Sequence, residues 1–208
     1  MTRAVLTLLA LALAMLSAGC SGGLRSSVPA TQVYVLRAAT RPEAHLKETN
    51  VSLHVNRPIA GPGLDSDHIV LVQSDHRMSY YAGSRWPTML PGLVEALAVD
   101  TLRSTGAWSS VQDSGSAFAS DYLLQIVIRR FEADYSANAS APEVHVLLDC
   151  TLGKRAGREI QASFIASGSA TAGENRMAAV IAAFESAAAQ AMNEIAQKVE
   201  SPVPSITR

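Results

Sequence analysis

The sequence predicts an α+β fold in which two amphipathic helices pack on one face of an antiparallel or mixed β-sheet. Runs of alternating apolar residues, typical of half-buried strands, recur in both halves of the chain. Two longer segments instead space their apolar residues as one face of a helix does. Each helix has a single apolar stripe and therefore needs only one surface to cover. Hydrophobic residues make up 48% of the 208 residues, which suffices for one domain with a core.

The first 19 residues have the features of a signal peptide. Arg3 gives a basic start, and an apolar run follows over residues 4–16. That run is shorter than the ~20 apolar residues that a membrane-spanning helix needs. It has the length of a signal-peptide apolar region, and small residues and Cys20 follow it. We therefore predict a signal peptide over residues 1–19.

The segment around Cys20 resembles a bacterial lipobox, in which the cysteine becomes the acylated first residue of the mature chain. One position departs from that pattern, because Ser17 stands where leucine is favoured. The alternative is ordinary cleavage near Ala18 or Gly19, which would release a soluble secreted protein. Residues 20–30 are rich in Ser, Gly and Pro, and we expect the lipidated cysteine to begin a flexible tether there.

Four strand candidates occupy the first half of the remaining chain, at residues 32–37, 51–55, 68–74 and 78–82. The last two form a predicted hairpin that turns at Asp75-His76. Between the second and third candidates, residues 58–67 read as a loop. The Gly61-Pro62-Gly63 sequence in it is a turn, because it opens no helix and lacks the lysine of a phosphate-binding loop.

The clearest helix follows the hairpin. Pro91 stands in its first turn and Gly106 just past its end, which is the usual asymmetry of helix termini. Its apolar face comprises Leu90, Leu93, Val94, Leu97, Ala98 and Leu102. Extended chain resumes at residues 108–111.

The second half predicts a strand meander over residues 121–135, 142–152 and 158–167. Strict alternation in the first of these strands places Leu124, Ile126 and Ile128 on one face and Leu123, Val127 and Phe131 on the other. Cys150 alternates with apolar residues of the second strand, so we expect a buried thiol and not a catalytic one. The basic trio Lys154, Arg155 and Arg158 falls at the next turn, where a solvated turn is favoured over a phosphate site.

The last predicted element is a helix over residues 174–199. Its apolar stripe comprises Met177, Val180, Ile181, Phe184, Ala188, Ala191, Met192 and Ile195. Glu174 near its start and Lys198 near its end suit the helix dipole. Residues 201–208 contain two prolines, and we expect a flexible tail there.

Three stretches together resemble the ABC-type transport auxiliary lipoproteins, which are periplasmic partners of mammalian-cell-entry-type lipid transporters. The first runs from Tyr80 to Trp86 and leads into the first helix. The second runs from residue 121 to the Arg130-Phe131-Glu132 sequence, and the third is the alanine-rich final helix around Phe184. The resemblance implies an auxiliary lipoprotein domain over residues 31–200.

The resemblance also implies function. We expect a non-enzymatic subunit that is anchored in the envelope membrane through acyl chains such as palmitate on Cys20. Its partners would be the permease, the ATPase and the mammalian-cell-entry subunit of a lipid transporter. By resemblance to lipoprotein sorting, Ser21 predicts the periplasmic face of the outer membrane. The alternative is a structural or regulatory envelope lipoprotein without a transporter partner, and a homo-oligomer is left open.

The sequence offers little support for other functions. A net charge of −1 without a basic stripe argues against nucleic acid. No histidine pair has metalloprotease spacing, and no Gly-x-Ser-x-Gly elbow occurs between a predicted strand and a predicted helix. We interpret the two clusters of acidic residues and histidine, at residues 65–68 and 75–76, as loop caps and not as metal ligands. We therefore expect no enzyme activity, no cofactor and no metal.

The candidate partner surface comprises Tyr80, Tyr81, Arg85, Trp86 and Met89, whose residue types are enriched at protein interfaces. Because Tyr80 and Tyr81 alternate along a strand, one of them should be exposed. Trp86 has a second interpretation, which we favour, as a core plug beneath the first helix.

Overall fold

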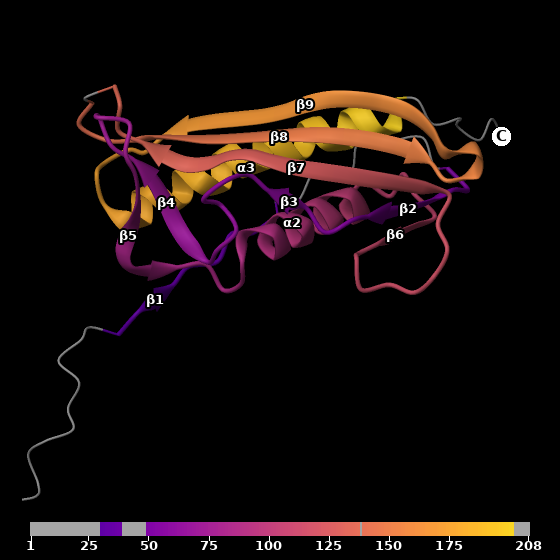
Figure 1. Ribbon diagram of the computed structural model, residues 1–208, viewed down its shortest axis with the longest axis horizontal. Helices are drawn as coiled ribbons and strands as arrows, with labels where there is room; N and C mark the ends of the chain where they lie inside the picture. The colour runs from indigo at the N-terminus through magenta and orange to yellow at the C-terminus, as the bar shows by residue number, and fades with distance from the viewer. Residues whose placement is uncertain (1–29, 39–48, 138, 202–208) are drawn as a thin grey trace, which may run out of the picture. The chain divides into compact units, whose positions relative to one another are not determined.

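The structure is a computed structural model that describes residues 30–38, 49–137 and 139–201 (Figure 1). The chain divides into two units, Met1–Thr31 and Gln32–Arg208. Of the first unit only Ala30 and Thr31 are described. The predicted signal peptide, Cys20, most of the tether and most of the tail lie outside the described residues.

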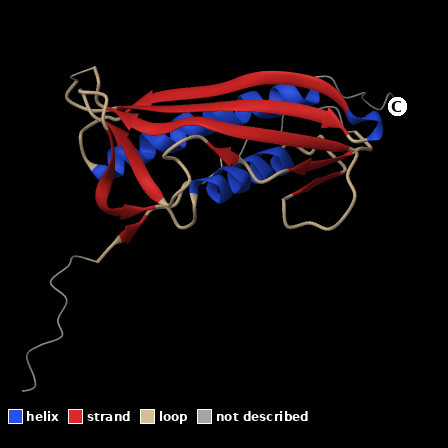
Figure 2. Cartoon of the chain, viewed as in Figure 1, coloured by secondary structure: helices blue, strands red, loops and turns tan. Residues whose placement is uncertain are grey.

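Three long antiparallel strands form one side of the sheet: β7 (Tyr122–Asp134), β8 (Glu143–Lys154) and β9 (Glu159–Thr171). The 3-10 turn η2 (Ala156–Arg158) connects β8 to β9. The shorter strands are β1 (Gln32–Val33), β2 (Ser52–Val55), β3 (Ile59–Ala60), β4 (His68–Val72), β5 (Met78–Arg85) and β6 (Ser110–Gln112). The meander and the hairpin that the sequence predicts are thus confirmed (Figure 2).

The short strands line up along the second side of β7. Its first residues pair in parallel with β2, its middle with β3 and its last residues with β4. The sheet then continues from β4 to β5, which is antiparallel, and to β1, which is parallel. At the other end β6 pairs in parallel with β2. The sheet is therefore mixed.

The two helices, α2 (Leu90–Ser104) and α3 (Met177–Glu200), lie on one face of this sheet and contact each other (Figure 1). Helix α3 packs along β8 and β9, and α2 packs near β2, β3 and β6. The predicted α+β class and helix placement are confirmed. Gly106 follows the C-cap of α2 and takes a φ of +64°. A left-handed glycine at this position terminates the helix, as its place in the sequence predicts.

An aromatic cluster joins the layers of the core. The rings of Phe131 on β7 and Phe184 on α3 stack with centroids 5.4 Å apart. Trp86 meets Phe184 edge to face at 5.2 Å and Phe131 at 6.1 Å. All three residues are at most 1% exposed. The cluster therefore ties the β5–α2 connection to the sheet and to the last helix.

The cluster corrects the predicted orientation of Phe131. Alternation placed this residue on the opposite face from Ile128, but the pairing with β8 shifts by one residue between Ile128 and Arg130. A bulge adds one residue to its strand, so every later side chain changes face. Phe131 consequently faces the helices with Leu124, Ile126 and Ile128.

Several strands and helices begin or end at other residues than predicted, because pairing with distant segments sets their limits. The first strand pairs over only two residues, and the loop at residues 58–67 contains β3, because Ile59 and Ala60 pair with β7. Helix α3 begins at Met177, so Glu174 precedes it. The buried hydrophobic residues that the structure describes lie between Leu36 and Val199, so we expect residues 31–208 to fold without the preceding segment. None of the described helices is long and apolar enough to cross a membrane.

Candidate functional site

The candidate partner surface lies on β5 and on the connection from β5 to α2, and three of its five predicted residues are exposed. Tyr80 is 43% exposed and Met89, just before α2, is 41% exposed. The Arg85 guanidinium is also open to solvent and lies 3.6 Å from the Asp67 carboxylate. Tyr80 and Tyr81 alternate across the strand as predicted, so only the first is exposed.

Tyr81 is half-buried, and its hydroxyl group links β5 to other segments by hydrogen bonds. Its hydroxyl lies 2.9 Å from the hydroxyl of Tyr135, which in turn donates to Oδ1 of Asn175 at 2.7 Å. Tyr81 therefore donates to Tyr135. Burial raises the pKa of Tyr81, and the hydrogen bond to Tyr135 adds to that effect. This chain connects the hairpin to the end of β7 and to the segment before α3.

Trp86 belongs to the core and not to the surface. Only 1% of it is exposed, and its rings pack on Phe131 and Phe184. Its backbone N–H donates to the carbonyl of Asp67 at 2.8 Å, which fixes the turn between β5 and α2. The core interpretation of Trp86 is confirmed, and its assignment to the partner surface is withdrawn.

The edge strand β1 adds an apolar residue to this surface. Val33 pairs with Arg85, Arg85 pairs with His68, and the His68 ring lies 4.7 Å from the Tyr80 ring. Val33 is 53% exposed. We call Val33, His68, Tyr80 and Arg85 the hairpin surface. Sequence reasoning missed Val33 because parallel pairing over some fifty residues leaves no local signal.

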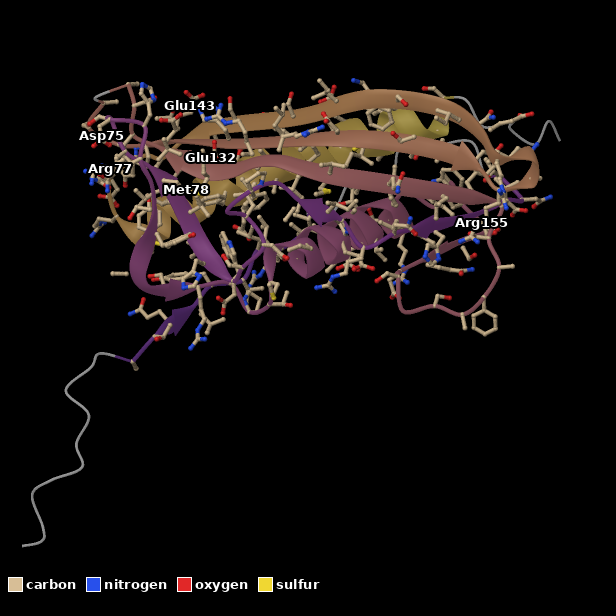
Figure 3. The ribbon with its side chains drawn as sticks, viewed as in Figure 1. Asp75, Arg77, Met78, Glu132, Glu143 and Arg155 are labelled. Atoms are coloured by element: carbon tan, nitrogen blue, oxygen red, sulfur yellow. The ribbon has the colours of Figure 1, made fainter. Side chains whose placement is uncertain are left out.

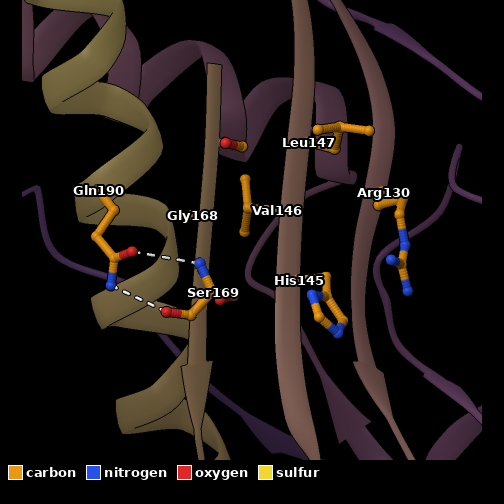
Figure 4. Close-up of a pocket in the computed structure, with 8 residues that line it drawn as sticks. Arg130, His145, Val146, Leu147, Gly168, Ser169 and Gln190 are labelled. Carbon is orange, nitrogen blue, oxygen red and sulfur yellow. Dashed lines mark hydrogen bonds between the residues drawn. The ribbon is translucent and has the colours of Figure 1, made fainter. Parts of the chain in front are cut away.

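A pocket of about 350 Å³ opens over β7, β8 and β9 (Figure 4). Its polar groups are already partnered. Arg130 pairs with Glu132, and its Nη2 lies 3.0 Å from the Asp134 carboxylate. Burial alone would raise the pKa of Asp134, but hydrogen bonds from Ser136 and Arg130 lower it. Gln190 both accepts from the N–H and donates to the carbonyl of Ser169. The pocket thus presents compensated charges.

The same pocket is lined by His145, Ser167 and Ser169. A histidine beside a serine is the arrangement that a serine hydrolase would need. His145 Nε2 lies 3.7 Å from the Glu143 carboxylate, and Ser169 faces His145 across the strands. Within the described part of the chain, no hydrogen bond joins Ser167 or Ser169 to His145. A serine nucleophile needs such contact with its base. The described residues also contain no group of three or more potential metal ligands.

The remaining predicted residues lie where the pattern placed them. Cys150 is 2% exposed and belongs to the core. Lys154, Arg155 and Arg158 are exposed at the β8–β9 turn. Asp75 pairs with Arg77 in the β4–β5 turn, where His76 takes a φ of +64°. Cys20 lies outside the described residues, so its acylation stays a prediction.

Comparison with known proteins places this architecture in a family. A family model described as ABC-type transport auxiliary lipoprotein component matches residues 34–196. Protein XCC0632 from Xanthomonas campestris is similar in structure, with a TM-score of 0.75 and 25% identity over 82% of this chain and 96% of its own. No curated protein matches.

Two further crystal structures share the fold at lower identity. One uncharacterized protein has a TM-score of 0.64 at 15% identity, covering 82% of this chain and 99% of its own. The hypothetical protein CT253 from Chlamydia trachomatis has a TM-score of 0.54 at 9% identity, covering 74% and 97%. Since the family model spans the domain from the residue after β1 to the last turns of α3, the chain belongs to the family of ABC-type transport auxiliary lipoprotein components.

Proposed function

We propose that this chain is a non-enzymatic, lipid-anchored subunit of a mammalian-cell-entry-type lipid transporter in the bacterial cell envelope. The match of the family model over residues 34–196 carries the proposal. The lipobox-like segment ending at Cys20 supports the anchor, and Ser21 favours the periplasmic face of the outer membrane. The compensated charges of the pocket over β7–β9 give no reason to prefer a catalytic role.

The hairpin surface is the proposed contact with the transporter. It combines an exposed tyrosine, an arginine and a valine, and Tyr and Arg are enriched where proteins bind one another. Trp86, the residue after Arg85, packs on Phe131 in the core and so ties the end of β5 to β7. A lipid anchor concentrates the domain at its membrane, so a contact of modest affinity suffices.

Co-purification tests the proposal. The anchored chain, isolated from envelope extract, should bring down a permease, an ATPase and a mammalian-cell-entry subunit. Tyr80→Ala and Arg85→Ala should each weaken that association several-fold without changing the circular dichroism spectrum. Phe118→Ala is the matched control, because Phe118 is 80% exposed on the separate loop before β7.

Other outcomes would redirect the assignment. Envelope residence without the transporter subunits would favour the structural or regulatory lipoprotein. Association that survives both hairpin variants would place the contact on a different surface. If His145→Ala abolished lipid transport while the association with the transporter stayed intact, an enzymatic role would be favoured instead.

A further inference from the structure

A second pocket, of about 420 Å³, lies at the opposite end of the long strands from the β4–β5 turn. Leu123 and Ile160 provide apolar walls, and Lys154, Arg155 and Arg158 stand at its rim with Glu159. Figure 3 shows Arg155 at this end and Asp75 and Arg77 at the other. We call this site the basic pocket.

The basic pocket carries an excess of positive charge, because Lys154, Arg155 and Arg158 share its rim with the single carboxylate of Glu159. Within the described ranges, no carboxylate lies within ion-pair distance of Lys154, Arg155 or Arg158. Lys154 acts on Asp121 only at longer range, where hydrogen bonds from Ser52 are the main cause of a lowered pKa. Three cations around one carboxylate attract an anion.

The backbone of Arg158 adopts a conformation that is unfavourable for arginine. Gly157 has a φ of +80° and Arg158 a φ of +54°, the left-handed region in which glycine and asparagine are favoured. An arginine here costs conformational energy, yet its side chain is exposed and does not belong to the buried core. Residues held in strained conformations cluster at functional sites, and the strain at Arg158 is consistent with such a site. The planar guanidinium group of an arginine can donate two parallel hydrogen bonds to the oxygens of one phosphate group.

The apolar walls identify which anion fits. Ile160 is 70% exposed, an unusual position for a large aliphatic side chain beside three cations. Inorganic phosphate would gain nothing from Ile160 or Leu123, whereas an amphiphile would cover both. We infer that the basic pocket binds the phosphate headgroup of an anionic phospholipid at a membrane surface, with Ile160 inserted beside the acyl chains.

This inference goes beyond the proposed function and does not depend on it. The hairpin surface and the basic pocket lie at different ends of the sheet, so a protein partner and a membrane can be engaged together. The membrane contact also differs from the anchor, because it requires no acylation of Cys20.

Vesicle sedimentation tests the inference with residues 31–208, which contain all of the described core. The protein should bind vesicles of phosphatidylcholine mixed with phosphatidylglycerol, and should not bind phosphatidylcholine alone. Added salt should release it, because it screens exposed charges. Binding to both kinds of vesicle, or to neither, overturns the inference.

Arg158→Asn is the decisive variant. Asparagine adopts positive φ more readily than arginine, so the thermal midpoint should stay level or rise. Vesicle partitioning should fall about fivefold, which corresponds to ~1 kcal/mol for one cation near an anionic surface. Arg176→Asn makes the same charge change at an exposed, paired arginine and should bind as the unmodified protein does. Equal loss in both variants would show a mere net-charge effect and contradict the pocket.

Two further arms separate the sources of the anion. Ile160→Ser keeps the charge and should also weaken vesicle binding, and it decides the matter if Arg158→Asn fails to fold. Inorganic phosphate should displace the protein no better than chloride at equal ionic strength. Selective displacement by phosphate would reassign the pocket to a free anion, and an unaffected Ile160→Ser would contradict membrane insertion.

Discussion

The surroundings of Cys150 make its thiol group unreactive. It is 2% exposed beneath α3, and burial raises the pKa of its thiol to about 12. The reactive thiolate is therefore scarce at neutral pH. We predict that a thiol reagent will label Cys150 only as the protein unfolds, and that Cys150→Ala will lower the free energy of unfolding by about 1 kcal/mol. Labelling followed by mass spectrometry checks this, and rapid labelling of the native protein would contradict burial.

Gly168 is a second residue on which the packing depends. A Cβ built there would lie 2.0 Å from the carbonyl oxygen of Ala187 and 2.8 Å from Cβ of Gln190. The backbone of α3 thus approaches β9 more closely than any side chain allows. Gly168→Ala should cost about 3 kcal/mol, the upper range for overpacking. Gly173→Ala is the control, since its Cβ would meet nothing within 4 Å. Equal thermal midpoints for the two variants would show that the layers can separate.

At the scale of elements, α3 covers the free edge of β9. Glu194 accepts from the N–H of Ser167 at 2.8 Å, and Lys198 donates to the carbonyl of Ile165 at 3.0 Å. Gln190 binds both backbone groups of Ser169. Four helical residues rise about 6 Å and two strand residues about 6.7 Å, so successive turns of α3 meet alternate residues of β9. An edge of this kind would otherwise pair with other chains.

Glu194 makes this contact sensitive to acid. Burial acts to raise its pKa, but the hydrogen bonds from Lys198 and Ser167 outweigh it and lower the pKa. A lowered native pKa stabilises the fold above the unfolded pKa, and that stability is lost as the pH falls through the native value. Glu194→Gln should therefore be less stable than the unmodified protein at neutral pH, with the gap closing in acid. Urea titrations at several pH values check this, and a constant gap would exclude the linkage. Glu174→Gln serves as the exposed control.

At the scale of the whole molecule, the anchor remains the prediction with the widest effect. Cys20→Ser should leave an unprocessed precursor and remove the acyl mass, because the thiol is the group that we expect to be acylated. A single acyl chain holds a protein only marginally, and two or more hold it stably. Intact mass spectrometry of the membrane fraction checks this. A processed, soluble protein without lipid would favour ordinary cleavage near Ala18 or Gly19.

The sequence predicts this architecture as far as its period-two and helical patterns persist. The stripes of α2 and α3 are visible because each helix buries one continuous face. The bulge after Ile128 is invisible to alternation, which is why Phe131 was assigned to the wrong face. Strand β3 was missed because its pairing with residues 127 and 128 depends on a distant segment.

The candidate surface was predictable only in part for the same reason. Residue type and alternation identify Tyr80 and Arg85, but Trp86 has the same composition signal and is buried. The difference comes from Phe184, almost a hundred residues away, whose ring covers it. The basic trio was visible, whereas the left-handed Arg158 and the apolar wall beside it required the fold.

The cover over β9 comes from the last helix of the chain, and this order has a cost during biosynthesis. Ribosomes build the chain from its N-terminus, so β9 is complete before Gln190, Glu194 and Lys198 exist. Throughout that interval the nascent sheet offers Ile165, Ser167 and Ser169 to any neighbouring strand. Chains truncated within α3 should therefore aggregate, and a chaperone that delays folding until residue 198 has emerged would protect the newborn protein.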